Sequence, residues 1–438
     1  MWPGYVLFNG TEVINATRTE AYAAHANVGW FKPVYEQPDL PWLLGEKPYA
    51  TPLQDDAPWT DPDRLDSYDF YGCYPLEIVG FEDSTAEASA IESVIDGGYV
   101  NKPRRKTRTM VFTAVLVGAS QCAVEYGMRW LRSVLTTTNC NSASYGVCGG
   151  SEMCYLGCEP VIDDNASEGL TAEECYDKIG RSMHDVTTTN GPVVTAKMDL
   201  NDGGCAWSVS WTMIAANPAE FGVEKPIVVG FLDPAVEVPY YGGVIPEGAH
   251  FDDDGHVDDD PVCPVETYIP VYDPMCDLLS PPPDIPTVVP TCFDFPPNFL
   301  RFSFVIPRED IPLWDQVVPI IKLTTRAEEA RNVRLRFYAD VFGTGSPDSD
   351  PCNYCGDIVI SYIPPSSTLV IDGPDHDIYL DSAGIGRRRA DSLATDSSGK
   401  PMDWPEFSCG FGYVVTVDMP QQQTGRPVVD LALVSRIA

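Results

Sequence analysis

Residues 104–135 carry the clearest pattern of apolar and polar positions in the chain. Residues 109–117 form a short apolar run rich in Val, Phe, Thr and Leu, which is typical of a strand covered on both faces. Gly118 ends the run, and Ser120 is a residue type that caps helices. Apolar positions then recur at helical spacing, at Val124, Gly127, Met128, Leu131, Val134 and Leu135. We therefore predict a strand followed by an amphipathic helix that packs on other elements.

Period-two alternation dominates the C-terminal third of the chain. Residues 300–306 and 333–341 place apolar side chains opposite polar ones, as half-buried antiparallel strands do. Short apolar runs separated by turn residues follow at 358–363, 368–371, 378–380, 411–417 and 428–434. This spacing predicts a galectin-like or similar β-sandwich.

Shorter elements are predicted in the first half. Residues 193–198 and 206–214 alternate on either side of an Asn-Asp-Gly-Gly turn, which predicts a β-hairpin. Thr171, with Glu174 three residues later, predicts the start of a helix over 171–182. Residues 74–81 indicate a strand and residues 85–95 a short helix. The fold class predicted is mainly β (all-β or α+β), with one packed amphipathic helix in an N-terminal β domain.

Segments rich in proline, aspartate or cysteine divide the chain into predicted domains. We predict an N-terminal domain over 1–232, which includes an extended arm at 37–69 and a Cys-rich insertion at 136–182. Prolines recur from 233 to 297 and disfavour helices and interior strands, so this segment is predicted to be a linker or strap. The β-sandwich domain then occupies 298–438.

Charge and composition narrow the possible partners. The 438-residue chain carries 64 acidic and 28 basic residues, a formal net charge of −36, which repels nucleic acid and anionic lipid surfaces. The amino terminus shows no secretory signal, and the longest apolar runs are strand-sized. We expect no nucleic-acid recognition and no membrane insertion.

Catalytic signatures are missing from the sequence. It contains no HExxH, GxSxG, P-loop or GxGxxG motif, and its five histidines share no metal-ligand spacing. We therefore expect a protein that is not an enzyme and needs no cofactor. A glycosidase with paired carboxylates stays possible, because such pairs meet only in the fold.

One acidic loop is a candidate calcium site. Asp252, Asp254 and Asp258 surround Gly255 and supply the oxygen ligands that calcium prefers. The glutamate that closes an EF-hand loop is missing, so a solvated acidic loop is the alternative.

The fourteen cysteines allow three interpretations. Cys352 and Cys355 form a CxxC, but structural zinc usually needs a second such pair. Disulfides that form outside the reducing cell, or buried free thiols, are the alternatives. The candidates for a disulfide or thiol cluster are Cys140, Cys148, Cys154, Cys158, Cys352 and Cys355.

Several segments resemble minor tail proteins of siphophages that infect actinobacteria, and in particular a group similar to distal tail proteins. The likeness covers roughly the first third of the chain, with a weaker one near the C terminus. The segments are 10–15 with Arg18 and 21–22, 55–63, 70–72, 97–99, the basic stub 104–108, 110–117, 123–131, and then 362–365 and 369–373.

This resemblance implies a structural role in the virion, at the phage tail tip, after assembly in the host cytoplasm. It implies a ring, usually a hexamer, that joins the tail tube to the baseplate or receptor-binding apparatus and contacts other tail proteins. Arg104, Arg105, Arg108 and Trp59 are then candidate subunit-interface residues; the arginines could pair with acidic surface or simply solvate a loop.

Two other functions are kept open. A peripheral carbohydrate-binding or adhesion module could stack exposed aromatics such as Trp314 or Trp404 on a host surface glycan. A tail-associated cell-wall hydrolase is the third candidate.

Overall fold

The computed structural model of the 438-residue chain describes most of the sequence, with gaps. The described residues are 1–28, 34–35, 37–82, 86–92, 98–101, 104–136, 151–161, 170–200, 204–228, 236–239, 250–251, 257–258, 298–312, 315–341, 343, 354–382, 386–397, 399–407, 411–420 and 426–437.

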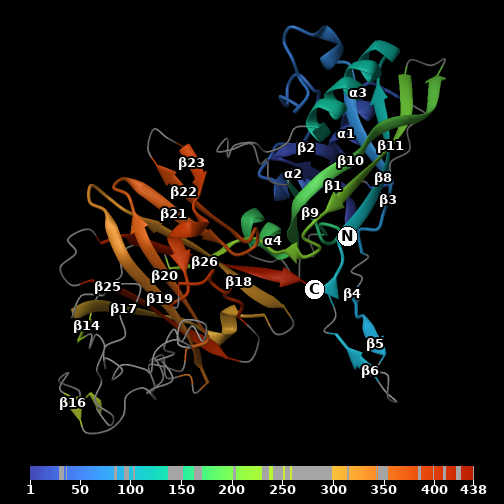
Figure 1. Ribbon diagram of the computed structural model, residues 1–438. Helices are drawn as coiled ribbons and strands as arrows, with labels where there is room; N and C mark the ends of the chain where they lie inside the picture. The colour runs from blue at the N-terminus through green and yellow to red at the C-terminus, as the bar shows by residue number, and fades with distance from the viewer. Residues whose placement is uncertain are drawn as a thin grey trace. The chain divides into compact units, whose positions relative to one another are not determined.

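The chain forms two compact units. Unit 1 comprises Met1–Val223 together with Arg436–Ala438, and unit 2 comprises Glu224–Ser435. Strands predominate in both, and all described strand pairs are antiparallel (Figure 1). The prediction of a mainly β fold is confirmed.

The main sheet of unit 1 follows from the alternation in its strands. Its order is β3 (Phe70–Val79), β8 (Arg108–Gly118), β11 (Gly204–Ala215), β10 (Gly180–Leu200), β9 (Ser151–Leu156), β1 (Trp2–Phe8) and β2 (Thr11–Asn15). The predicted strand 109–117 lies in β8, between β3 and β11, and the predicted hairpin is the β10–β11 pair. A short strand, β12 (Glu220–Phe221), pairs with β10 and with the last residues of β26 (Val428–Ile437).

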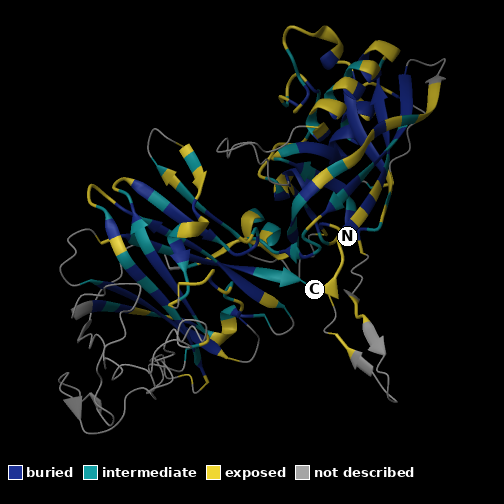
Figure 2. Ribbon diagram, viewed as in Figure 1, coloured by how far each residue is buried: buried dark blue, intermediate teal, exposed yellow. Residues whose placement is uncertain are grey.

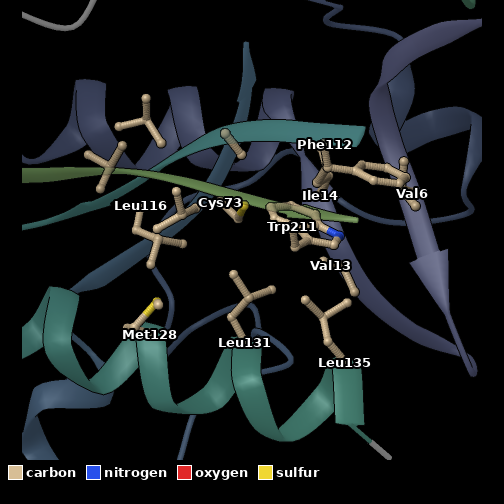
Figure 3. Packing of buried hydrophobic residues seen from close by; sticks show 14 of the residues in the cluster. Val6, Val13, Ile14, Cys73, Phe112, Leu116, Met128, Leu131, Leu135 and Trp211 are labelled. Atoms are coloured by element: carbon tan, nitrogen blue, oxygen red, sulfur yellow. The ribbon is translucent and has the colours of Figure 1, made fainter. Parts of the chain in front are cut away.

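The predicted amphipathic helix is α3 (Gln121–Thr136). The Ser120 hydroxyl accepts the Ala123 backbone N–H at 3.2 Å, so Ser120 caps the helix as expected. Met128, Leu131 and Leu135 of α3 point at the sheet residues Leu116, Cys73 and Trp211 (Figure 3). Gly127 is required at its position, because a Cβ there would lie 2.2 Å from the Phe70 ring. Helix α1 (Ala16–His25) also packs on β3 and β8.

Smaller elements complete unit 1. They are α2 (Leu40–Leu43), a 3-10 turn η1 (Leu65–Ser67) and α4 (Ala172–Ile179). Helix α4 has the predicted capping box of Thr171 and Glu174 but ends at Ile179, because Gly180 begins β10.

The short helix expected over 85–95 is wrong. Residues 86–92 contain β4 (Ala86–Glu87) and β5 (Ala90–Glu92), which pair with β7 (Arg104–Arg105) and β6 (Gly98–Val100). Pairing with strands distant in sequence prevails here over local helix preference, which is a weak signal when tertiary partners are present.

Unit 2 contains two sheets around one core. One sheet has the order β14 (Val236–Pro239), β17 (Asn298–Ile306), β25 (Gly412–Pro420), β19 (Ala330–Asp340), β20 (Gly356–Ile363) and β24 (Ala394–Thr395). The other contains β13 (Lys225–Val228), β26 (Val428–Ile437), β18 (Gln316–Thr324), β21 (Ser367–Asp372), β22 (Asp377–Ser382) and β23 (Gly386–Arg389). Leu335, Phe337 and Val415 from the first sheet share the core with Ile321 and Leu369 from the second, as a sandwich requires.

Short elements surround these sheets. They are the strands β15 (His250–Phe251) and β16 (Val257–Asp258) and the 3-10 turns η4 (Arg308–Asp310) and η5 (Asp391–Leu393). Figure 2 shows that buried residues line the strands of both units, whereas exposed ones lie in turns, on helix surfaces and along parts of strands such as β10.

Candidate functional site

The basic stub divides into two parts in the structure. Arg108 begins β8, and its side chain is only 2% exposed. Its Nη1 donates to the Phe81 carbonyl at 2.6 Å and to Glu220 Oε1 at 2.5 Å. A buried guanidinium needs such partners, because an unpaired charge inside a protein is strongly destabilising. Arg108 therefore links β8 to β12 inside unit 1.

Arg104 and Arg105 lie in a two-stranded arm. They form β7, which pairs with β4 so that Arg104 is opposite Glu87 and Arg105 opposite Ala86. Lys106 forms an ion pair with Glu87. The residues 87–89, 100–101 and 104–107 are all exposed, so this part of the arm has no core of its own (Figure 2). The two guanidiniums remain accessible to another molecule.

Trp59 lies inside unit 1. It is 3% exposed, and its Nε1 donates to the Phe70 carbonyl at 2.9 Å. Its ring makes edge contacts with Tyr22, Phe70 and Trp130, at centroid distances of 5.2–6.3 Å. These contacts attach the irregular segment 37–69 to the core, and aromatic pairs of this geometry add to the area that they bury.

Two residues of the N-terminal resemblance, Glu12 and Arg18, form a buried ion pair that the half-exposed Glu46 extends. Arg18 Nε lies 2.8 Å from Glu12 Oε1, and its Nη2 lies 2.9 Å from Glu46 Oε2. The Arg18 guanidinium also covers the Tyr49 ring at 4.2 Å. Burial raises the pKa of Glu12, and the adjacent Arg18 charge opposes that shift. The cluster fastens segment 46–49 to α1 and β2, which is a structural role.

Unit 2 contains ion pairs that sequence reasoning missed. Arg301 binds Asp418 through two hydrogen bonds of 2.7 and 2.9 Å, and Arg334 Nη2 lies 2.9 Å from Asp357. In β17, β25, β19 and β20, these charged residues alternate with the apolar residues of the core. That alternation is the sequence signal that could have identified them.

The described candidate cysteines carry free thiols. These are Cys154, Cys158 and Cys355, and burial together with Glu152 raises the pKa of Cys154. Cys140, Cys148 and Cys352 lie outside the described residues. Disulfide bonding through those three stays a prediction.

The other candidates yield no composite site in the described part of the chain. Asp258 belongs to β16, whereas Asp252 and Asp254 lie outside the described residues. No cluster of three or more histidine, cysteine or acidic side chains suited to a metal occurs among the residues described. No helix in the described ranges has the length and hydropathy to span a membrane.

Comparisons with known proteins give structural neighbours alone. No protein-family model and no curated protein matches the chain. Among solved structures, it is similar to the SPP1 Dit (gp 19.1) protein, titled a paradigm of hub adsorption apparatus in Gram-positive-infecting phages. That match has 9% identity and a TM-score of 0.34, and covers 84% of this chain and 94% of that one.

Two structures of the phage P2 baseplate in its activated conformation are also similar. The calcium form has 7% identity and a TM-score of 0.34, and the strontium form 8% and 0.32. Each covers 80% of this chain and 92% of the other. The neighbours are thus hub and baseplate proteins of phages, at TM-scores too low to establish a common fold.

Proposed function

We propose that this chain is a structural component of a phage tail tip, a ring-forming adaptor between the tail tube and the baseplate or receptor-binding apparatus. The resemblance of its first third to tail proteins similar to distal tail proteins supports this role. The structural observation that carries the proposal is the exposed arm with Arg104 and Arg105. The protein would act in the virion through its geometry rather than through a reaction.

The arm suits contact with a neighbouring subunit. An isolated two-stranded ribbon is marginally stable in water, so an exposed one gains stability from a partner. The chain carries a net charge of −36, so a second copy has acidic side chains in excess with which the two guanidiniums can pair. Arm-to-body contacts join different surfaces, and such head-to-tail contacts form a ring when the rotation between subunits closes. Six subunits is the number that the family resemblance favours.

The test is the mass of the purified chain by light scattering, with negative-stain imaging. We expect a discrete ring for the wild type and loss of the ring when Arg104 and Arg105 are both replaced by Glu. The matched control is Arg129→Glu, which alters an exposed arginine on α3 whose ion partner, Glu125, is also exposed. Arg108 is left intact because it is buried. A ring that survives in the double variant would contradict the arm's role.

The carbohydrate-binding alternative has less support. Trp404 is half-buried against the core of unit 2 and stacks on His376, with ring centroids 5.0 Å apart and planes 26° apart. One face of the indole is therefore occupied by protein, which favours packing over sugar stacking. Trp314 lies outside the described residues. A glycan array with saturable hits would revive this alternative.

A further inference from the structure

Part of the second face of the sheet segment β3–β8–β11–β10 is exposed, whereas Val115, Val117 and Ala206 on the same face are buried. Along β8, even-numbered side chains from Arg108 to Leu116 point into unit 1, whereas Thr109, Val111 and Thr113 point out. Cross-strand pairing places outward residues of the other three strands beside them. The open face comprises Glu77, Val79, Thr109, Val111, Thr113, Thr187, Asn190, Val193, Ala196, Ser208, Ser210, Thr212 and Ile214, all exposed or half-exposed.

The open face is poor in charge. Glu77, on the edge strand β3, is the one ionisable side chain among its thirteen residues. The others are hydroxyl, amide or aliphatic, and Val79, Val111 and Val193 are 52%, 37% and 52% exposed. The chain as a whole has 21% charged residues. Depletion of charged side chains is a feature that this surface shares with the core of a protein interface, whereas its Ser, Thr and Asn side chains are typical of exposed surface.

The edge strands of this sheet segment are protected against pairing with a further strand, whereas its open face is not protected against contact. Within the described residues, β3 pairs with β8 alone, and β10 beyond Val186 pairs with β11 alone. The β10 edge contains Pro192 and three register shifts, and β3 contains Pro75 and two. Prolines and bulges at edges hinder the addition of another strand. Contact through the face is therefore favoured over edge-to-edge pairing.

We propose that the open face is a contact between two copies of this chain, which pack sheet against sheet in an isologous dimer. Copies with a net charge of −36 repel each other, and repulsion is smallest between surfaces with little charge, such as the open face with Glu77 alone. With strands spaced by about 4.8 Å and same-face residues by about 6.8 Å, the thirteen residues give a footprint of about 420 Å² per copy. Two copies then bury about 850 Å², the size of a weak, transient interface.

The contact is independent of the arm and of the tail-tip role. A patch that meets its own copy across a two-fold axis closes as a dimer, whereas arm-to-body contacts continue around a ring. The two contacts also respond oppositely to salt. Salt screens the repulsion between acidic copies and strengthens the face contact, but it weakens attraction between the arm's arginines and acidic surface.

The experiment uses the full chain with Arg104→Glu and Arg105→Glu, so that the arm contact is removed. Sedimentation is measured from about 1 to about 100 µM, the range expected for an interface of this size. We expect a monomer–dimer equilibrium that tightens with added salt. Val111→Arg or Thr212→Arg, at neighbouring positions in the centre of the face, should weaken it by about 100-fold or more, because an unpaired charge would be buried.

The matched control is Val305→Arg on β17 of unit 2. Val305 is 39% exposed, close to the 37% of Val111. The Val305→Arg substitution should therefore leave the dimer unchanged. Val111→Thr should also dimerise, which shows that charge rather than any change at this site breaks the contact. A monomer throughout the concentration range, a dimer that survives Val111→Arg, or equal loss in Val305→Arg would each overturn the proposal. Circular dichroism confirms that every variant is folded.

Discussion

The two units differ in the side chains that they carry on the second face of a sheet. In unit 1, the open face is exposed and carries a single ionisable side chain, Glu77. In unit 2, the equivalent outward positions of β17, β25, β19 and β20 carry Arg301–Asp418 and Arg334–Asp357, whose side chains are only 6–15% exposed. The same alternation of apolar and other residues thus produces two results. Where the second set is charged, it pairs across strands within the unit, and where it is nearly uncharged, it is left available for another molecule.

The largest effect is expected when one of these buried ion pairs of unit 2 is broken. Asp418→Ala removes both of these hydrogen bonds from the mostly buried guanidinium of Arg301. Removing one partner of a buried pair costs about 3–5 kcal/mol of unfolding free energy. The change is measured by urea unfolding, with amide hydrogen exchange of β17 and β25 peptides to show that unit 2 is affected.

Glu329→Ala is the control for that prediction. It removes the partner of Arg331 on the same sheet, but this pair is solvent-exposed, with side chains 61% and 42% exposed. Exposed pairs contribute little because water screens them. Equal losses of stability in Asp418→Ala and Glu329→Ala would show that burial of the pair is not what matters.

A smaller loss of stability should separate the two faces of the unit 1 sheet. Leu131→Ala removes a fully buried side chain of α3 beneath the inward face, for which about 3 kcal/mol is expected. Val111→Ala, on the open face, should cost less than about 1 kcal/mol in the monomer. Urea unfolding at low protein concentration measures both. Similar losses would mean that the open face is packed within its own chain.

Local pattern predicted the centre of unit 1 well. The run 109–117 and the spacing from Val124 to Leu135 contained enough information for β8 and α3, because alternation and helical period act over neighbouring residues. Thr171 and Glu174 predicted the start of α4 for the same reason. The sequence prediction grouped Arg108 with the basic stub. Arg108 is two residues before Met110 and four before Phe112 in the strand, so its side chain lies with theirs on the inward face.

Interactions distant in sequence could not be predicted in this way. Arg301 and Asp418 are 117 residues apart, and nothing local to either residue identifies its partner. The segment around Trp59 shows no periodicity, yet its aromatic contacts reach Phe70 and Trp130. The helix expected at 85–95 failed because the partners of β4 and β5 lie further along the chain.

The smallest predicted effect compares one thiol on each face of the same sheet. Cys73 faces inward and is 1% exposed, and burial raises the pKa of its thiol, so it should react with a maleimide only after unfolding. Val111→Cys should add one readily labelled thiol to those of the exposed Cys122, Cys158 and Cys355. Peptide mass spectrometry assigns each label.

Labelling at position 111 also reports on the proposed dimer. Its rate should fall a few-fold as protein concentration rises through the dimerisation range, because the thiol is accessible in the free monomer alone. Val305→Cys in unit 2 should show no such dependence, since its position is equally exposed but lies outside the open face. A rate at position 111 that is independent of concentration while dimers form would place the contact elsewhere. The open face would then be exposed in the dimer as well, and a partner other than a second copy would have to account for its low charge.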